Sequence, residues 1–365
     1  MADIGKIVAG FRKQVGESYF IVNGEPTGFL STGWAPLDRA MGGGFAIPKL
    51  TVLAGKYSAG KTMLALVAAK QVQAQGGLVV YCNSERAPVA TRAAQLGIDI
   101  TADSWMELAV PVLDSYYKGE GAKVAKTKEN LVMGFFDIMT LLLNMIHDAD
   151  PNRLILVILD TVSTTPTARA LQGIAGQALV GNTARVMGQC MPGFNQQMSD
   201  LKVAVIFINH LTQKIGQSWG DDTTMVADTQ QGHYAVNVVK MWRTKDLEVN
   251  KKPVGHEIRA RVTKNKITGT RVKDVKFPIY YDTGIPEIAG MVELLAENST
   301  RKGFIELAGK QEGKNAVIDK AASDPALTRA LRQEAQELMA KLLIEDKAAP
   351  PADAMSPVDD SSNPV

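Results

Sequence analysis

Gly55-Lys56-Tyr57-Ser58-Ala59-Gly60-Lys61-Thr62 is the stretch that decides the fold of this chain. Before it, residues 50–54 are apolar and partly β-branched, as in a buried parallel strand, and after it residues 63–75 are rich in helix-forming residues. Two glycines and a Lys-Thr pair at this spacing, between a strand and a helix, form the phosphate-loop motif. The alternative is a chance glycine turn before a core helix, which leaves the lysine and the threonine unexplained.

The loop is expected to end at the N-terminus of a helix, where backbone N–H groups lack partners and the helix dipole is positive. Such an end holds a polyphosphate through the main chain. We expect the Lys61 ammonium to reach the β- and γ-phosphates and the Thr62 hydroxyl to bind Mg²⁺. The predicted phosphate-binding residues are Gly55, Tyr57, Ser58, Ala59, Gly60, Lys61 and Thr62.

The composition excludes several classes of protein. A net charge of +2 over 365 residues gives no overall argument for nucleic-acid binding, so only local clusters of basic residues carry one. The two cysteines, Cys82 and Cys190, lie far apart in apolar segments and suggest neither a disulfide framework nor a zinc site. No cationic leader and no run of transmembrane length is evident. We therefore expect a soluble, cytoplasmic protein that does not enter a membrane.

Short apolar runs alternate with helical stretches through most of the chain. Strands separated by helices predict an α/β fold with a largely parallel sheet that helices cover on both faces. The apolar runs are residues 50–54, 78–82, 154–159, 203–208, 235–242 and 257–264.

The pattern changes at both ends of this core. We expect four parts: an N-terminal helix-and-strand arm at 1–27, the core at 28–284, a small helical and charged lobe at 285–344, and a disordered acidic tail at 345–365. The amphipathic helix in the arm needs an apolar surface to cover, on this chain or on a neighbouring copy.

Two carboxylates follow predicted strands and complete a nucleotide-handling set. Asp160 ends a run of six apolar residues, so it is expected at the same sheet edge as the phosphate loop, where it helps to hold Mg²⁺. The alternative is a cap for the next turn. Glu85 follows the next strand and is placed to orient the attacking water. Its alternative is a solvated carboxylate paired with Arg86 or Arg92, and spacing does not separate the two.

Further motifs resemble the RecA family of homologous-recombination ATPases over nearly the whole chain. Residues 30–38 and the glycines at 42–44 resemble the segment that leads into the family's phosphate loop. Residues 83–87 resemble its catalytic-glutamate segment, 206–210 its γ-phosphate-sensing strand end, and 263–266 its paired lysines. Together these motifs are far more specific than the phosphate loop alone.

The resemblance implies a RecA-like core with a mostly parallel sheet flanked by helices, an N-terminal polymerisation arm and a small helical C-terminal lobe. It also implies a DNA-dependent ATPase that uses ATP and Mg²⁺. The enzyme would form helical filaments on single-stranded DNA, pair it with homologous double-stranded DNA and exchange strands. Lys61, Thr62, Asp160 and Glu85 would take the roles given above.

The resemblance places the pair Lys264 and Lys266 on the γ-phosphate of ATP held by the adjacent subunit, so ATP would lie at the subunit interface. The alternative for the pair is a solvated strand edge.

His210 stands where bacterial members of the family have glutamine. A histidine at this position is similar to the bacteriophage UvsX-type branch, and it would either contact the γ-phosphate or be a polar residue at the strand end. Arg92 aligns with a tyrosine that stacks on adenine, and its guanidinium would stack or stay exposed. At two further positions this chain also departs from the bacterial pattern: His233 replaces an interface phenylalanine, and Ala227-Asp228 replace a glycine pair.

Two long stretches, 164–180 and 210–231, are predicted to be mobile loops, and long loops inside a compact α/β domain are usually functional or disordered. In the RecA family these positions match the two DNA-binding loops. Basic residues there would neutralise phosphates, Ile215 would wedge between bases, and Trp219 would stack on a base or anchor the loop. The predicted DNA contacts are Arg169, Arg185, Lys214, Ile215 and Trp219.

Two other functions remain open at this stage. A hexameric replicative helicase shares the same core, although the short arm and the type of C-terminal lobe argue against it. The second alternative is a non-catalytic, nucleotide-gated filament that protects DNA. Glu85 argues against this alternative, because such a filament needs no carboxylate to position water.

Overall fold

A computed structural model describes residues 13–14, 24–101, 103–117, 130–172, 181–213, 223–268, 274–307 and 310–348 of the chain. Most of the predicted N-terminal arm and the tail after residue 348 lie outside the described residues. So do the predicted DNA contacts Lys214, Ile215 and Trp219, which stay predictions. In the described part of the chain, no helix is long and apolar enough to span a membrane.

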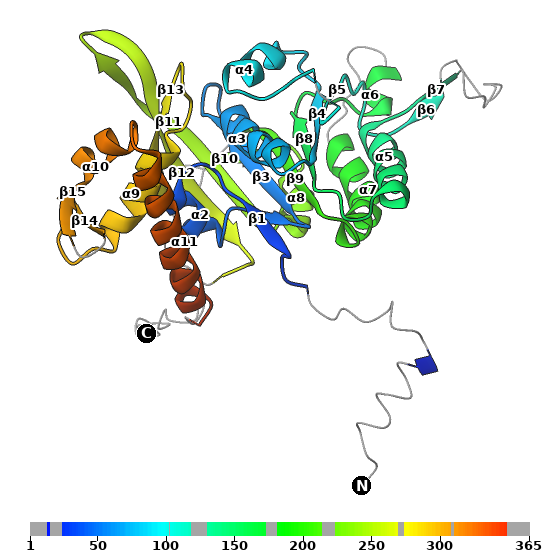
Figure 1. The fold of residues 1–365 in the computed structure, drawn as a ribbon. Helices are drawn as coiled ribbons and strands as arrows, with labels where there is room; N and C mark the ends of the chain where they lie inside the picture. Colours follow the sequence, from blue (N-terminus) through cyan, green and yellow to red (C-terminus); the bar gives the residue numbers. More distant parts are fainter. Residues whose placement is uncertain are drawn as a thin grey trace, which may run out of the picture.

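A nine-stranded sheet forms the centre of the molecule (Figure 1). Its order is β13-β12-β11-β3-β9-β8-β4-β5, and β10 pairs with β9 outside this path. Strands β11, β3, β9, β8, β4 and β5 run parallel, whereas β12, β13 and β10 each run antiparallel to a neighbour. The strands are β3 (Leu50–Gly55), β4 (Leu78–Asn83), β5 (Trp105–Leu108), β8 (Ile155–Asp160), β9 (Val203–Gln213), β10 (Thr223–Met225), β11 (Asn237–Val249), β12 (Lys252–Asn265) and β13 (Asp274–Tyr280).

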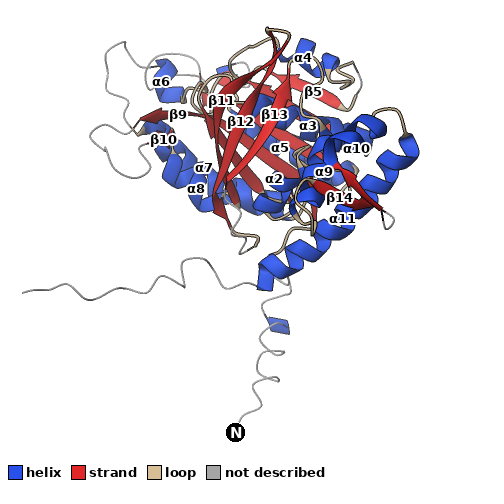
Figure 2. Cartoon of the chain, turned by 90° about the vertical axis from the view of Figure 1, so that its left-hand side faces the viewer, coloured by secondary structure: helices blue, strands red, loops and turns tan. Residues whose placement is uncertain are grey.

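Helices cover both faces of this sheet (Figure 2). They are α2 (Ala35–Met41), α3 (Lys61–Ala74) and α4 (Val89–Gln95) on one face, and α5 (Phe135–Ala149), α7 (Asn182–Ser199) and α8 (Asp228–Tyr234) on the other. The short α6 (Ala168–Gln172) follows β8. Small antiparallel pairs, β1 (Gly28–Leu30) with β2 (Phe45–Ile47) and β6 (Tyr116–Tyr117) with β7 (Leu131–Val132), lie outside the sheet.

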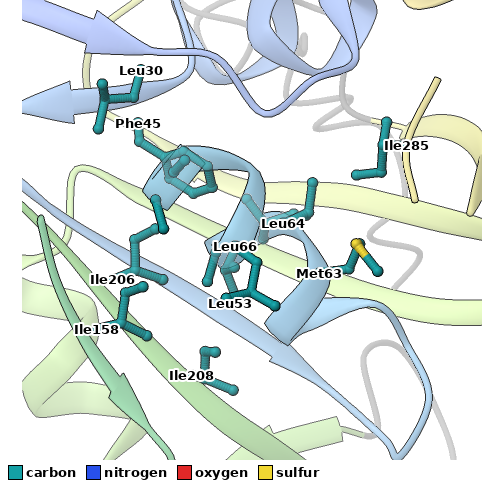
Figure 3. Packing of buried hydrophobic residues seen from close by; sticks show 14 of the residues in the cluster. Leu30, Phe45, Leu53, Met63, Leu64, Leu66, Ile158, Ile206, Ile208 and Ile285 are labelled. Carbon is teal, nitrogen blue, oxygen red and sulfur yellow. The ribbon is translucent and has the colours of Figure 1, made fainter. Parts of the chain in front are cut away.

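The central strands alternate their side chains between two hydrophobic cores, as extended backbone requires. Leu53, Ile158 and Ile206 pack beneath α3 in the first core, where Figure 3 shows them beside Leu64 and Leu66. The intervening residues of the same strands pack beneath α5 and α7 in the second core. Burial on both faces explains why these strands read as continuous apolar runs.

A small lobe follows the sheet and has a hydrophobic cluster of its own. It contains α9 (Glu287–Glu297), the hairpin of β14 (Phe304–Leu307) and β15 (Lys310–Gly313), α10 (Lys314–Ala321) and α11 (Pro325–Ala348). The sequence predicted a helical lobe and missed this hairpin. The boundaries predicted at 27/28 and 284/285 stay predictions.

The helix α11 also corrects the predicted start of the disordered tail. It continues to Ala348, beyond the predicted tail boundary at 345. Two ion pairs join its last turns to other parts of the chain: Arg39 of α2 donates to Asp346 at 3.0 Å, and Lys347 donates to Glu25, ahead of β1, at 3.0 Å. The charged residues at 345–348 have the composition of a solvated tail. The prediction failed because their ion-pair partners lie more than 300 positions away in the sequence.

All six predicted apolar runs are strands, and β9, β11 and β12 are longer than expected. The edge strand β13 was not predicted. It contains Pro278, which lacks a backbone N–H and is tolerated at a sheet edge.

Candidate functional site

The carboxyl ends of four neighbouring parallel strands, β3, β9, β8 and β4, bring the predicted nucleotide-handling residues to one edge of the sheet. Gly55 at the end of β3 is in register with His210 on β9, and Asp160 at the end of β8 is in register with Asn83 at the end of β4. The phosphate loop begins at Gly55, and Glu85 comes two residues after Asn83. Such an edge is where open α/β sheets bind ligands.

The phosphate loop needs its two glycines for close packing and for backbone conformation. A Cβ at Gly55 would lie 2.7 Å from the Met241 carbonyl oxygen of β11. At Gly60 the φ angle is +83°, a left-handed value, and a Cβ would lie 2.5 Å from Ile279. Gly60 directly precedes α3, whose first N–H groups therefore face the loop.

Lys61 is the buried cation of this loop. Its ammonium group donates to the carbonyl oxygens of Gly55 and Lys56, each at 2.9 Å. Burial lowers the pKa of Lys61, and the nearby carboxylates of Asp160 and Glu85 oppose that shift. The two carbonyls hold the ammonium beside the cradle, from which it can turn toward a bound phosphate.

Thr62 and Asp160 fit the magnesium site that the sequence predicted. The Thr62 hydroxyl donates to Asp160 Oδ2 at 2.9 Å, so two oxygen ligands from α3 and β8 are already adjacent. Hydroxyl and carboxylate oxygens are the ligands that Mg²⁺ prefers. The predicted alternative, Asp160 as a turn cap only, does not account for this contact.

Tyr81, which the sequence analysis did not single out, is a third member of this group. Its hydroxyl on β4 donates to the same Asp160 Oδ2 at 2.5 Å. Burial raises the pKa of Asp160, whereas the hydrogen bonds from Tyr81 and Thr62 lower it. Tyr81 therefore supports the ionised carboxylate that a metal needs.

Glu85 contacts His210 rather than an arginine. His210 Nε2 lies 2.9 Å from Glu85 Oε1, and the Thr161 hydroxyl donates to the same oxygen at 3.4 Å. Arg92 is held elsewhere, by the carbonyl oxygens of Tyr280 and Tyr281. Among the described residues, the ion-pair partner of Glu85 is therefore His210, and neither Arg86 nor Arg92 takes the place that the predicted alternative gave them.

A cavity of about 410 Å³ opens beside the phosphate loop and Arg92 lines it. Its walls are residues 58–62 of the loop, Met63, Arg92, His256, Ile279 and Tyr281. The aromatic and apolar side chains suit a nucleoside next to the phosphate cradle. His256 and Tyr281 were missed because they belong to the β12–β13 region, where β13 itself was not predicted.

Lys264 on β12 and Lys266, just after the end of that strand, both bind the end of α8. Lys264 donates to the Gly232 carbonyl oxygen, and Lys266 donates to the His233 carbonyl oxygen at 3.0 Å. Partial burial and the adjacent Lys266 charge lower the pKa of Lys264 to about 8. The two cations thus complement the negative end of a helix, which differs from the predicted alternative of a freely solvated strand edge.

The predicted DNA-contacting residues fall into two groups. Arg169 on α6 and Arg185 in the first turn of α7 are described, and both are exposed. The prediction that 164–180 and 210–231 are entirely loops is wrong in part, because α6, the end of β9, β10 and α8 occupy their described portions. These elements were missed because their segments are short and polar and lack the regular spacing of apolar residues that predicts a helix or a strand.

The functional role of Tyr81 was missed in the sequence for a different reason. A tyrosine inside a buried strand reads as core, and only the pairing of β4 with β8 shows that its hydroxyl meets Asp160.

Comparison with known proteins gives a consistent result. Residues 13–108 and 129–286 match the family model described as the RecA N-terminal domain. A protein named Protein RecA from a Nostoc species is 27% identical over 317 residues, which cover 86% of this chain and 81% of that protein. Protein RecA of Streptomyces venezuelae is 29% identical, with 78% and 67% covered, and that of Caulobacter vibrioides is 26% identical, with 86% and 83% covered.

Proposed function

The chain belongs to the RecA family, and from that premise we propose that it is a DNA-dependent ATPase that forms helical filaments on single-stranded DNA. In that filament it would pair the strand with homologous double-stranded DNA and exchange strands. The observation that carries the proposal is the meeting of the phosphate loop, Asp160 and Glu85 at one sheet edge. A purely structural polymer has no need of a carboxylate beside its phosphate site.

ATP is the substrate in this proposal. The loop N–H groups and Lys61 bind its phosphates, and Thr62 with Asp160 would hold Mg²⁺, which neutralises charge on the β- and γ-phosphates when bound. Glu85 orients the attacking water, and His210 donates to a γ-phosphate oxygen. The cavity beside Arg92 takes the nucleoside. The interpretation of His210 as a bacteriophage-type feature remains part of this proposal.

Self-assembly with ATP at the subunit interface would bring a second set of cations to the nucleotide. Lys264 and Lys266 would leave the α8 carbonyls and contact the γ-phosphate on the neighbouring copy. An exposed apolar stripe supports assembly: Leu141 and Met145, one helical turn apart on α5, are 53% and 60% exposed. We propose that the apolar face of a neighbour's arm, residues 1–27, covers this stripe.

DNA would lie along the side of the molecule from which α6 and the first turn of α7 project. Arg169 and Arg185 supply exposed positive charge there, and we assign Lys214, Ile215 and Trp219 to the same surface on the basis of the sequence. We also propose a cytoplasmic location, in contact with the nucleoid or, for a bacteriophage protein, in the host.

The decisive experiment uses the full-length protein with single-stranded DNA. We expect ATP hydrolysis to rise at least about tenfold when DNA is added, and electron microscopy with a slowly hydrolysed ATP analogue to show long helices. Closed rings would favour the helicase, and DNA-bound filaments without hydrolysis would favour the non-catalytic filament. Monomers with both ligands at saturation would refute the proposal.

A matched pair of variants tests the assembly surface. Met145→Glu should abolish filaments, because the change puts a negative charge on the stripe. Ile344→Glu places the same charge on α11 at a side chain that is 70% exposed, and it should leave filaments intact. Equal filament formation by both variants would remove α5 from the interface.

A further inference from the structure

His210 has two ring nitrogens in very different surroundings. Nε2 lies 2.9 Å from Glu85 Oε1, whereas Nδ1 is buried and has no hydrogen-bond partner among the described residues. A doubly protonated ring would leave a charged N–H group buried and unpaired at Nδ1, which is the costlier arrangement. The contacts therefore favour a neutral ring that carries its one proton on Nε2 and donates it to Glu85.

That single N–H group has two possible acceptors. His210 is in register with Gly55, so its ring lies beside the start of the phosphate loop. A γ-phosphate oxygen accepts hydrogen bonds and cannot donate one, so it needs the same Nε2–H group that Glu85 holds. Glu85 and the γ-phosphate would therefore compete for one proton.

Tyr57 is the aromatic side chain that contacts the His210 ring. It lies on the phosphate loop, and its side chain is 82% exposed, so it has no role in the core. Its ring centroid is 4.9 Å from that of His210, with the planes inclined by 45°. An aromatic ring at this distance restricts rotation of the imidazole.

We propose that Tyr57 is a positioning residue that holds His210 in a latch on Glu85, and that the latch keeps hydrolysis slow until the γ-phosphate takes the Nε2–H group. Released from the latch, Glu85 accepts a hydrogen bond from the attacking water. Because β9 continues from His210 to Gln213, toward the segment predicted to contact DNA, DNA binding has a direct connection to the latch. This inference rests on the ATPase function proposed above.

The first test does not depend on hydrolysis. The protein has four histidines, so selective ¹⁵N labelling of histidine gives few ring signals, and His210→Asn assigns that of His210. Without nucleotide, we expect the His210 signals of a neutral ring protonated at Nε2. Tyr57→Ala should replace them with averaged tautomers, and Tyr57→Phe should restore the wild-type pattern because the ring remains. A wild-type ring protonated at Nδ1, or an unchanged pattern in Tyr57→Ala, would overturn the proposal.

The second test measures turnover without DNA. Tyr57→Ala should hydrolyse ATP with a kcat roughly threefold or more above that of Tyr57→Phe, both measured at saturating ATP because Tyr57 lies in the phosphate loop. Equal kcat values would refute the latch even where DNA still stimulates both proteins. If no variant hydrolyses ATP, the proposed function fails, whereas the ring signals still report whether Tyr57 holds His210.

Discussion

The two halves of the candidate site are built differently. On the metal half, Asp160 is 8% exposed, and its Oδ2 oxygen accepts hydrogen bonds from Thr62 and Tyr81. On the water half, the side chains of Glu85 and His210 are 33% and 18% exposed, and His210 Nδ1 has no partner in the described chain. The metal half, which keeps its charge, is fixed within the core. The water half, which changes hydrogen-bond partners in the proposed mechanism, is partly exposed, where side chains move at a low cost in free energy.

The local structure explains this difference. Asp160 is the last residue of β8, and strands β4 and β9 flank β8 on either side. Glu85 lies beyond the end of β4, next to Arg86, whose φ angle of +54° marks a tight turn. A strand end is held by its neighbours, whereas a turn residue is held mainly by its own side-chain contacts.

Glu85→Gln should have the largest effect, because it breaks the water half and leaves the metal half intact. The amide keeps the size of the side chain but is a poor acceptor for a proton of water, so kcat should fall by about 10²- to 10⁴-fold. ATP affinity and filament formation should persist. Steady-state kinetics and binding of a fluorescent ATP analogue measure the two quantities separately.

A control for this variant lies on the next strand. Glu107→Gln removes a charge on β5, and its remaining carbonyl oxygen still accepts the 2.7 Å hydrogen bond from Asn83. It should change kcat by less than about threefold. If the Glu85→Gln protein turns over at the rate of the Glu107→Gln protein, Glu85 does not position the water.

Tyr81→Phe should have an intermediate effect, because it removes one hydrogen bond from the metal half. A hydrogen bond to a charged group contributes about 1.5–3 kcal/mol, so Mg²⁺-dependent ATP binding should weaken by roughly tenfold or more. The loss should be larger in Mg²⁺ than in EDTA, because the tyrosine acts on the carboxylate. Titration calorimetry under both conditions measures it.

The same variant has a defined pH dependence. Burial raises the pKa of Asp160 in the folded protein, so the stability linked to its protonation is present at low pH and is lost as the pH rises through that raised value. Tyr81 opposes this loss by supporting the ionised form. Tyr81→Phe should therefore destabilise the protein more at pH 8 than at pH 4 in urea unfolding. Equal destabilisation at both values would show that Tyr81 contributes packing only.

The sequence predicts the metal half better than the water half. The phosphate loop and Asp160 follow apolar runs whose parallel order is dictated by burial on both faces, so their common edge follows from the pattern. Tyr81, His256 and Tyr281 did not follow from it. Tyr81 joins the site through the pairing of β4 with β8, and the β12–β13 hairpin that brings His256 and Tyr281 is placed by the pairing of β11 with β3. These pairings join strands that are distant in the sequence, and no local pattern carries that information.

The contact between Glu85 and His210 shows the same limit. The sequence analysis gave Glu85 and His210 separate roles. The two residues are 125 positions apart in the chain, and they meet only because β4 and β9 lie on either side of β8. Spacing left the partner of Glu85 undecided. The prediction of the two loops was partly wrong for a similar reason, since α8 is fixed by Lys264 on β12 and by Lys266 just after it.

His210→Gln should have the smallest effect and sharpens the comparison most. A glutamine amide can donate one hydrogen bond to Glu85 or to a γ-phosphate oxygen, so the exchange of partners survives and kcat should stay within about fivefold of wild type. His210→Ala, which has no donor, should lose DNA stimulation. A His210→Gln protein as impaired as His210→Ala would mean that the water half needs the imidazole ring itself, and that the site is as rigid there as it is around Asp160.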